Sequence, residues 1–343
     1  MRQETIRRLT SIGLLTVLLL FFGLSNKTFL TPANLTALLR DCSPIGIVAV
    51  GVTMIIITAG IDLSTGAMAG FVAMLCANLL YYAKLPGAVI VLIALAAGTL
   101  SGLLNGALVA YLRLPDFIAT LSTQFLFRGL SYVLAIRNEF GMISNKIITD
   151  PVILTLSGSI GGIYLVTFAF AIVAIAGQFI MKRTKLGTYT YAIGANRRSA
   201  ELSGISYERT KMAVFAITGF LVGMASVFLM GRIRSVTPDT GTGMEFDVIA
   251  AVVMGGVAFS GGRGDVVGTV IGTVFMMTLI NGIYKYNLPT AVQLIIKGGV
   301  IIIMIIFDSV YAGYMYKRDV HLIDTDAGTP PANRNTPRRS RHG

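Results

Sequence analysis

Residues 53–70 read T-M-I-I-I-T-A-G-I-D-L-S-T-G-A-M-A-G, and this stretch decides how the chain is built. Asp62 lies inside a run that is otherwise apolar and long enough to cross a lipid bilayer. A carboxylate at the centre of a membrane helix costs about 2.5–3.5 kcal/mol even on insertion scales. Glycines stand on both sides of Asp62, and Ser64 follows it closely. The pattern therefore predicts an interrupted run, with Asp62 or Ser64 capping the helix that comes next.

The composition of the whole chain is that of a membrane protein. Apolar residues make up 54% of the 343 and charged residues only 13%, against about 25% charged in a soluble domain. A spanning helix needs about 20 apolar residues, so the length allows roughly ten. We predict an all-α polytopic membrane protein, with apolar spans at 12–24, 44–60, 66–82, 87–112, 117–136, 160–181, 212–231, 246–260, 266–284 and 290–312.

The positive charge indicates orientation rather than nucleic-acid binding. The net charge is +12, but the basic residues gather at the chain ends and in the polar loop 182–211, where orientation signals belong. With ten spans and basic segments in the cytoplasm, both termini and that loop are predicted to be cytoplasmic and residues 28–40 to lie outside. Arg232 and Arg234 do not follow this rule, because they would also lie outside. We expect a permease body at 1–316 and a basic, disordered cytoplasmic tail at 317–343.

The motifs of enzymes and metal sites do not occur. Cys42, Cys76, His321 and His342 provide neither a metal-ligand set nor a disulfide framework. The chain has no G-x-x-x-x-G-K-[ST] phosphate loop, and residues 261–268, G-G-R-G-D-V-V-G, lack the dinucleotide-binding spacing. We therefore predict no cofactor, no metal and no catalytic residue.

Two segments resemble each other. Residues 104–115, L-N-G-A-L-V-A-Y-L-R-L-P, and residues 280–289, I-N-G-I-Y-K-Y-N-L-P, share N-G and L-P. Their spans are five apart and run in opposite directions, so a true repeat is an inverted one, as in many transporters. Short matches between glycine-rich helices also arise by chance.

The loop 182–211 contains signals for a short surface helix. Asn196 or Ser199 can serve as the N-cap ahead of A-E-L-S, and Gly204 as the C-cap. We predict a helix at 197–203 that lies parallel to the membrane. The alternative is a solvated basic loop that only sets the orientation.

Several motifs together resemble the membrane subunit of bacterial ABC importers of the ribose, xylose, galactoside and autoinducer-2 branch. They occur in matching order between about residues 8 and 312. The motifs are G-I-D-L-S-T-G (60–66), L-P-D-F-I-A-T-L-S-T (114–123), T-K-L-G-T-Y-T-Y-A-I-G-A-N (184–196), A-E-L-S-G-I (200–205) and G-T-G-M-E-F-D-V-I-A-A-V-V-M-G-G-V-A-F-S-G-G-R-G-D-V-V-G-T-V-I-G (241–272). Thr65, Ala195 and Phe246 depart from the commoner residues.

The resemblance implies an ATP-driven sugar importer of the bacterial inner membrane that performs no chemistry itself. Its partners are a separate ABC ATPase subunit, a periplasmic substrate-binding protein, a second permease chain and the membrane lipid. The predicted helix would then dock on the ATPase. The residues that we assign to this coupling are Gly194, Asn196, Ser199, Ala200, Glu201 and Gly204.

Polar and charged residues inside the spans are candidates for the translocation path or its gate, each with a structural alternative. Asp62 can secure the interruption, Arg128 can reach the interface or a carboxylate, and Lys297 needs a partner. Glu245 and Asp247 can favour the helix dipole or receive the binding protein. The candidate path residues are Asp62, Asn105, Phe117, Arg128, Glu245, Asp247 and Asn281; the two asparagines can also bridge helices.

Two other function classes remain open from the sequence. An ion-coupled secondary transporter would use Asp62, Glu245 or Asp247 as its coupling carboxylates. A membrane-embedded enzyme would need a clustered nucleophile or a metal-ligand set, which the sequence lacks. ATP-driven uptake that depends on a separate ATPase subunit distinguishes an ABC importer from a secondary transporter.

Overall fold

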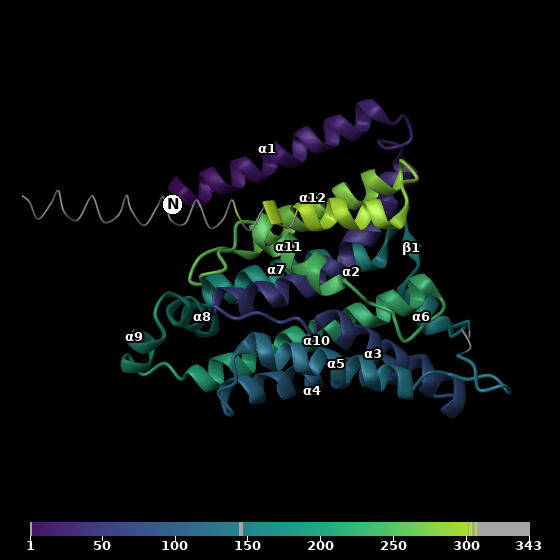
Figure 1. The fold of residues 1–343 in the computed structure, drawn as a ribbon, viewed down its shortest axis with the longest axis horizontal. Helices are drawn as coiled ribbons and strands as arrows, with labels where there is room; N and C mark the ends of the chain where they lie inside the picture. The colour runs from purple at the N-terminus through teal and green to yellow at the C-terminus, as the bar shows by residue number, and fades with distance from the viewer. Residues whose placement is uncertain (1, 144–146, 301, 304–305, 307–343) are drawn as a thin grey trace, which may run out of the picture.

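The computed structural model describes residues 2–143, 147–300, 302–303 and 306, and these residues are mostly helical (Figure 1). The helices are α1 (Arg2–Ser25), α2 (Pro32–Ile57), α3 (Thr65–Asn78), the π-helix η1 (Leu79–Ala83), α4 (Gly87–Ala110), α5 (Asp116–Val133), α6 (Pro151–Leu156), α7 (Leu165–Arg183), α8 (Lys185–Ala195), α9 (Arg197–Leu202), α10 (Tyr207–Ile233), α11 (Met244–Met254) and α12 (Val266–Tyr284). A further apolar helix covers Thr290–Val300. One short antiparallel hairpin, β1 (Ser159–Ile160) with β2 (Ile163–Tyr164), precedes α7.

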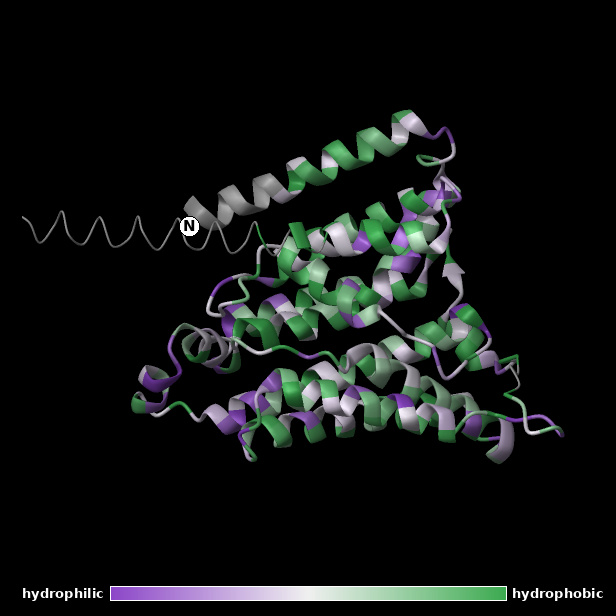
Figure 2. Ribbon diagram, viewed as in Figure 1, coloured by the Kyte–Doolittle hydropathy of each residue, from purple (hydrophilic) through white to green (hydrophobic). Residues whose placement is uncertain are grey.

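Six helices in the described part of the chain are long and apolar enough to cross a membrane: α2, α3 continued by η1, α4, α7, α10 and α12. Figure 2 shows hydrophobic residues along most of their length, with hydrophilic residues concentrated near the ends of the bundle. The other four predicted spans correspond to α1, α5, α11 and Thr290–Val300, which are shorter or less apolar. The architecture is that of a helical membrane protein, and the count of ten spans stays a prediction.

Helices α2 and α10 form the centre of the bundle. Val48, Val52 and Ile56 of α2 are completely buried, and α10 packs against α2, α3 and α4. A Cβ placed on Gly98 of α4 would overlap the carbonyl oxygen of Gly219 of α10. Glycines four residues apart, Gly98 and Gly102 of α4 and Gly219 and Gly223 of α10, therefore let these two backbones touch.

The structure moves two of the predicted boundaries. Helix α2 begins at Pro32, not near 44, because the Thr31 hydroxyl accepts a bond from the Asn34 amide and proline suits the first helical position. Helix α11 has only 11 residues, about 17 Å at 1.5 Å per residue, so 246–260 is not one spanning helix. The irregular segment that follows α11 is tolerated because it packs against protein.

The two ends of the bundle carry different elements. Figure 1 shows the beginning of α1 at the same end as α8 and α9, whereas β1 and α6 lie at the opposite end. This arrangement agrees with placing the N-terminus and the loop 182–211 on one side of a membrane. The predicted tail at 317–343 lies outside the described residues, as do residues 301, 304–305 and 307–312 of the last predicted span.

Candidate functional site

The interruption at Asp62 is a short non-helical segment, residues 58–64, between α2 and α3. Asp62 is 1% exposed. Its Oδ1 accepts bonds from the Ser64 backbone amide at 2.8 Å and from the Ser64 hydroxyl at 2.6 Å. Neither side chain caps α3, so that part of the prediction was wrong. Asp62 instead closes the turn just before the helix, because a carboxylate readily bonds an amide two residues ahead.

Helices α4 and α5 hold this segment in place. Asn105 of α4 donates from Nδ2 to the Ser64 hydroxyl at 2.7 Å, and it is completely buried. Thr120 of α5 accepts a bond from the Leu63 amide at 3.2 Å. Asn105 therefore bridges two elements, and the broken backbone gains polar partners that lipid could not supply.

Helix α5 presents a row of polar side chains at four-residue spacing, which places them on one face of the helix. We name this row the α5 polar stripe; it consists of Asp116, Thr120, Gln124, Arg128 and Tyr132. Asp116 bonds to α10, Thr120 to the segment 58–64, Gln124 to α11, and both Arg128 and Tyr132 to the segment between α10 and α11. The sequence analysis missed this row as a unit, although the spacing was its signal.

The part of the stripe toward the C-terminal end of α5 holds the start of α11 and the segment that precedes it. Gln124 donates to Glu245 Oε1 at 3.2 Å. Arg128 donates to the carbonyls of Pro238 at 2.6 Å and Thr240 at 3.0 Å, so backbone oxygens, rather than lipid headgroups or a carboxylate, are its hydrogen-bond acceptors. Phe117 is 52% exposed and does not join the other candidates.

Glu245 and Asp247 lie in the first turn of α11 and are both buried. Their contact with the binding protein stays a prediction. Asp247 pairs with Lys297, which identifies the partner that Lys297 needs. A Cβ placed on Gly66 would overlap Glu245 Oε2, so only glycine leaves room for this carboxylate.

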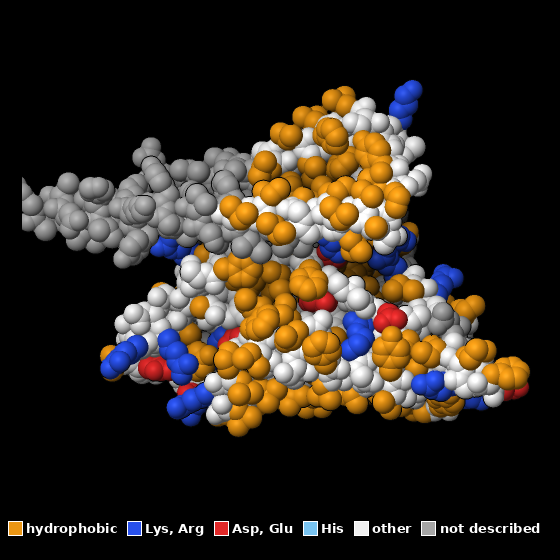
Figure 3. Space-filling model, viewed as in Figure 1, with side chains coloured by type: hydrophobic (Ala, Val, Ile, Leu, Met, Phe, Trp, Pro, Cys, Tyr) orange, Lys and Arg blue, Asp and Glu red, His pale blue; other side chains and the backbone are white. Residues whose placement is uncertain are grey.

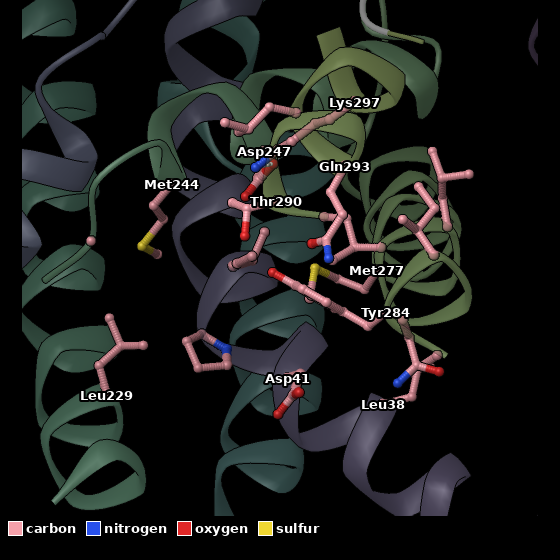
Figure 4. A pocket seen from close by; sticks show the side chains of 18 of the residues that line it. Leu38, Asp41, Leu229, Met244, Asp247, Met277, Tyr284, Thr290, Gln293 and Lys297 are labelled. Atoms are coloured by element: carbon pink, nitrogen blue, oxygen red, sulfur yellow. Dashed lines mark ion pairs between the residues drawn. The ribbon is translucent and has the colours of Figure 1, made fainter. Parts of the chain in front are cut away.

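A cavity of about 290 Å³ lies among α2, α10, α11, α12 and the helix Thr290–Val300. Figure 4 shows the Asp247–Lys297 pair on one side of it and Asp41 on another, with Tyr284 and Gln293 nearby. Asp41 also pairs with Arg232 at 2.9 Å. The volume lies near the lower end for ligand pockets, and the lining combines apolar side chains with a few polar ones.

Asn281, another lining residue of this cavity, has a structural partner. Its Oδ1 accepts a bond from Asn34 Nδ2 at 2.9 Å, which ties α12 to the start of α2. Asp41 and Gln293 were not singled out from the sequence, and Arg232 was noted only as an exception to the predicted topology. Only the folded chain brings them together with Asp247.

The predicted surface helix is present as α9, and the structure confirms its N-cap. Asn196 Oδ1 accepts a bond from the Ser199 amide at 3.0 Å. Gly204 follows the helix at φ +82°, a conformation that favours glycine. Ala200 is buried against Ile193 and Tyr207.

Two charged residues line the exposed side of α9. Arg197 donates to Glu201 at 2.8 Å and stacks on the Tyr207 ring, with its guanidinium carbon 3.6 Å from the ring centroid. Partial burial lowers the pKa of Arg197, but the bond to Glu201 and the nearby acidic groups outweigh it, and the pKa lies above its ordinary value. The helix therefore carries a permanent positive charge at its start.

Gly194 connects α8 to the bundle core. A Cβ at this position would overlap the carbonyl oxygen of Ile57 and lie 2.5 Å from the amide nitrogen of Gly262. The amide of Gly262 donates to the same Ile57 carbonyl at 2.8 Å. The end of α2, the end of α8 and the segment after α11 therefore meet at one point, and glycine is needed there for close approach.

The surface of the bundle is mainly apolar, with the basic side chains mostly at its margins, as expected of a helical membrane protein. Figure 3 shows apolar side chains over most of the visible face, Lys and Arg mainly at its margins, and a few acidic and basic side chains between. The described residues contain no group of three or more His, Cys, Asp or Glu that could hold a metal. Broken helices and a polar stripe along α5, with a capped surface helix at one end, define the class of polytopic transport proteins.

Known proteins identify the family. Residues 34–305 match the family described as branched-chain amino acid transport system / permease component, and the chain belongs to it. It is a membrane permease component and not a catalytic enzyme.

The chain is similar over most of its length to three permeases. The ribose import permease protein of Haemophilus influenzae is 34% identical over 297 residues, which cover 86% of this chain and 91% of the relative. That of Bacillus subtilis is 35% identical over 292 residues, covering 85% and 89%. The xylose transport system permease protein of Haemophilus influenzae is 31% identical over 350 residues, covering 85% and 93%. No solved structure matches the chain significantly.

Proposed function

We propose that this chain forms the translocation path of an ATP-driven ABC importer for a sugar or a sugar-like molecule. The observation that carries the proposal is the similarity to ribose and xylose permeases over at least 85% of the chain. The described residues contain no candidate metal cluster, and the sequence lacks a phosphate-binding loop. ATP hydrolysis therefore belongs to a separate ATPase subunit, and a periplasmic protein delivers the sugar.

The proposed topology has ten membrane segments with both termini in the cytoplasm of a bacterial inner membrane, and α11 crosses together with the irregular segment that follows it rather than as one helix. The order of elements supports an inverted repeat. In the first half α2 is followed by a break, α3, α4, a Leu-Pro pair and α5; in the second, α10 is followed by a break, α11, α12, a Leu-Pro pair and the helix Thr290–Val300. The first helix of each half packs against two helices of the other half. Helix α2 contacts α11 and α12, and α10 contacts α3 and α4.

In this proposal α9 docks on the ATPase. It lies at the end of the bundle beyond α8 (Figure 1), and its Leu202 side chain is 83% exposed. A large apolar side chain on a short polar helix is suited to fill a pocket on a partner. Gly194, Asn196, Ser199, Ala200 and Gly204 shape and anchor the helix, whereas Glu201 and Leu202 face outward.

Two permease chains are expected in the complex, either identical or related, because one chain supplies half of a symmetric path. The candidate path residues Asp62, Asn105, Phe117, Arg128, Glu245, Asp247 and Asn281 remain part of the proposal. Mass measurement of the complex in detergent should give two permease chains for two ATPase domains. A single permease chain would contradict this assembly.

Reconstituted uptake tests the function. Proteoliposomes that contain the permease and the ATPase should import ribose or xylose only with ATP and the binding protein. Import driven by an ion gradient without the ATPase would instead indicate a secondary transporter.

The variants Glu201→Arg and Leu202→Ser should lose at least 90% of uptake and of transporter-stimulated ATP hydrolysis at normal expression. Their fold should persist, since exposed helix pairs contribute only about 0.3–0.5 kcal/mol. Glu139→Arg, an exposed change in the segment after α5, is the matched control and should transport normally. Normal uptake by Glu201→Arg combined with Leu202→Ser would refute docking through α9.

A further inference from the structure

Lys211 is a buried cation close to the start of α10. Its side chain is 1% exposed, and its Nζ lies 2.6 Å from Oδ2 of Asp116, the first residue of α5. Removing a lysine from water is unfavourable unless it is paired, and Asp116 meets that need. The pair fixes the beginning of α10 to the beginning of α5.

The ion pair is linked to α9 through the Tyr207 ring. Tyr207 precedes Lys211 by one helical turn on the same face of α10, and the Lys211 Nζ is 5.8 Å from the centroid of its ring. Arg197 of α9 stacks on that same ring, and Ala200 of α9 packs in the same cluster. A displacement of α9 therefore acts on the turn of α10 that carries Lys211.

The other side of the ion pair contacts the interrupted segment 58–64. A Cβ placed on Gly60 would overlap both Asp116 Oδ2 and Lys211 Nζ, so the backbone at this glycine lies against both charges. The preceding residue, Ala59, has φ +57°, which is unusual for a residue with a side chain. One turn beyond Asp116, Thr120 accepts the bond from Leu63.

We propose that the Lys211–Asp116 pair is a positioning link that transmits movement of α9 to the interruption between α2 and α3. This inference rests on the proposed function, in which α9 docks on an ATPase. When α9 shifts, Tyr207 and Lys211 move with it, and Asp116 carries α5 and the segment 58–64 along. The pair does not contact the sugar.

The test compares three variants in the full complex. Lys211→Met with Asp116→Leu removes both charges together, which leaves no unpaired ion and is compatible with a stable fold. Lys211→Glu with Asp116→Lys exchanges the charges and restores the pair. Thr218→Val is the control, because Thr218 is also buried on α10 but its hydroxyl bonds only to the Val214 carbonyl of its own helix.

Two readouts separate the link from a purely structural role. One is the amount of ribose or xylose imported per ATP hydrolysed in proteoliposomes. The other needs no sugar: the rate at which maleimide modifies Ile61→Cys, with and without ATP, in a chain whose buried Cys42 and Cys76 are replaced by alanine. Wild type and Thr218→Val should show ATP-coupled import and at least a threefold effect of ATP on modification.

The apolar pair should hydrolyse ATP within twofold of wild type, import at least tenfold less sugar per ATP, and lose the effect of ATP on the introduced thiol. The exchanged pair should recover that effect. The link would be overturned if the variant Lys211→Met with Asp116→Leu kept wild-type import per ATP and the wild-type effect of ATP on thiol modification. It would also be overturned if the variant Lys211→Glu with Asp116→Lys folded but showed no effect of ATP on that modification. If wild type imports neither sugar, the proposed substrate class fails, and the thiol measurement still decides the link.

Discussion

Substitution of Gly194 by alanine should open the junction between α2, α8 and the segment after α11. The added Cβ would overlap the Ile57 carbonyl oxygen and crowd the Gly262 amide at 2.5 Å. Both neighbours are backbone atoms, so no side chain can rotate away. The backbone must shift, and the 2.8 Å bond between Gly262 and Ile57 is lost or lengthened.

The cost follows from three contributions. Overpacking a tight site costs about 1–3 kcal/mol, and leaving a buried amide and carbonyl without partners costs about 1–3 kcal/mol more. Alanine gains about 1 kcal/mol over glycine within a helix. The net local destabilisation is therefore about 1–5 kcal/mol, and 1 kcal/mol already corresponds to roughly a fivefold change in an equilibrium.

Hydrogen exchange measured by mass spectrometry on a peptide that contains Gly262 reports this opening. Gly194→Ala should exchange there at least about five times faster than wild type, and its ATP-coupled uptake should fall. Gly129→Ala is the control, because a Cβ on Gly129 meets nothing within 4 Å. Unchanged exchange near Gly262 in a folded Gly194→Ala variant would refute the role of this contact.

Three further changes test other parts of the structure. Asp62→Asn should keep uptake because an amide oxygen can still accept both bonds from Ser64. Asp62→Ala should lose about 2–4 kcal/mol of stability in a thermal melt. Loss of uptake by a folded Asp62→Asn variant would favour a role of Asp62 as a coupling carboxylate. Arg128→Met should free the carbonyls of Pro238 and Thr240 and speed protease cleavage in the segment 234–243 at least fivefold, and equal cleavage would contradict that anchoring. A thiol introduced as Ser199→Cys should resist impermeant reagents in intact cells while one introduced as Phe140→Cys reacts, and the reverse pattern would invert the topology.

Local signals in the sequence determined much of the membrane fold. The apolar runs located the helices, because each must be long enough to cover hydrocarbon and each polar interruption must be explained. Asp62 correctly marked a break between α2 and α3. Asn196 and Gly204 correctly bounded α9, because caps act on amides only a few residues away.

Local signals failed where a boundary depended on a neighbouring segment. Thr31 and Pro32 start α2 earlier than hydrophobicity indicates. Helix α11 ends at Met254 although apolar residues continue, since the chain then turns to pack against the ends of α2 and α8. Asp62 accepts its bond from the Ser64 amide in the turn, not from an amide of α3. These amides are close in sequence, so the residue pattern alone does not select between them.

The partners of the charged residues were decided only by the tertiary structure. Asp116 and Lys211 are 95 residues apart, and Lys297 pairs with Asp247, 50 residues earlier in the chain. Nothing in the local sequence selects such pairs, because their energy depends on burial and on geometry that exist only after the helices pack. Arg128, for the same reason, is anchored by the carbonyls of a distant turn. The sequence by itself located the long apolar helices and the break at Asp62, and the packed helices decided which partners the charged residues have.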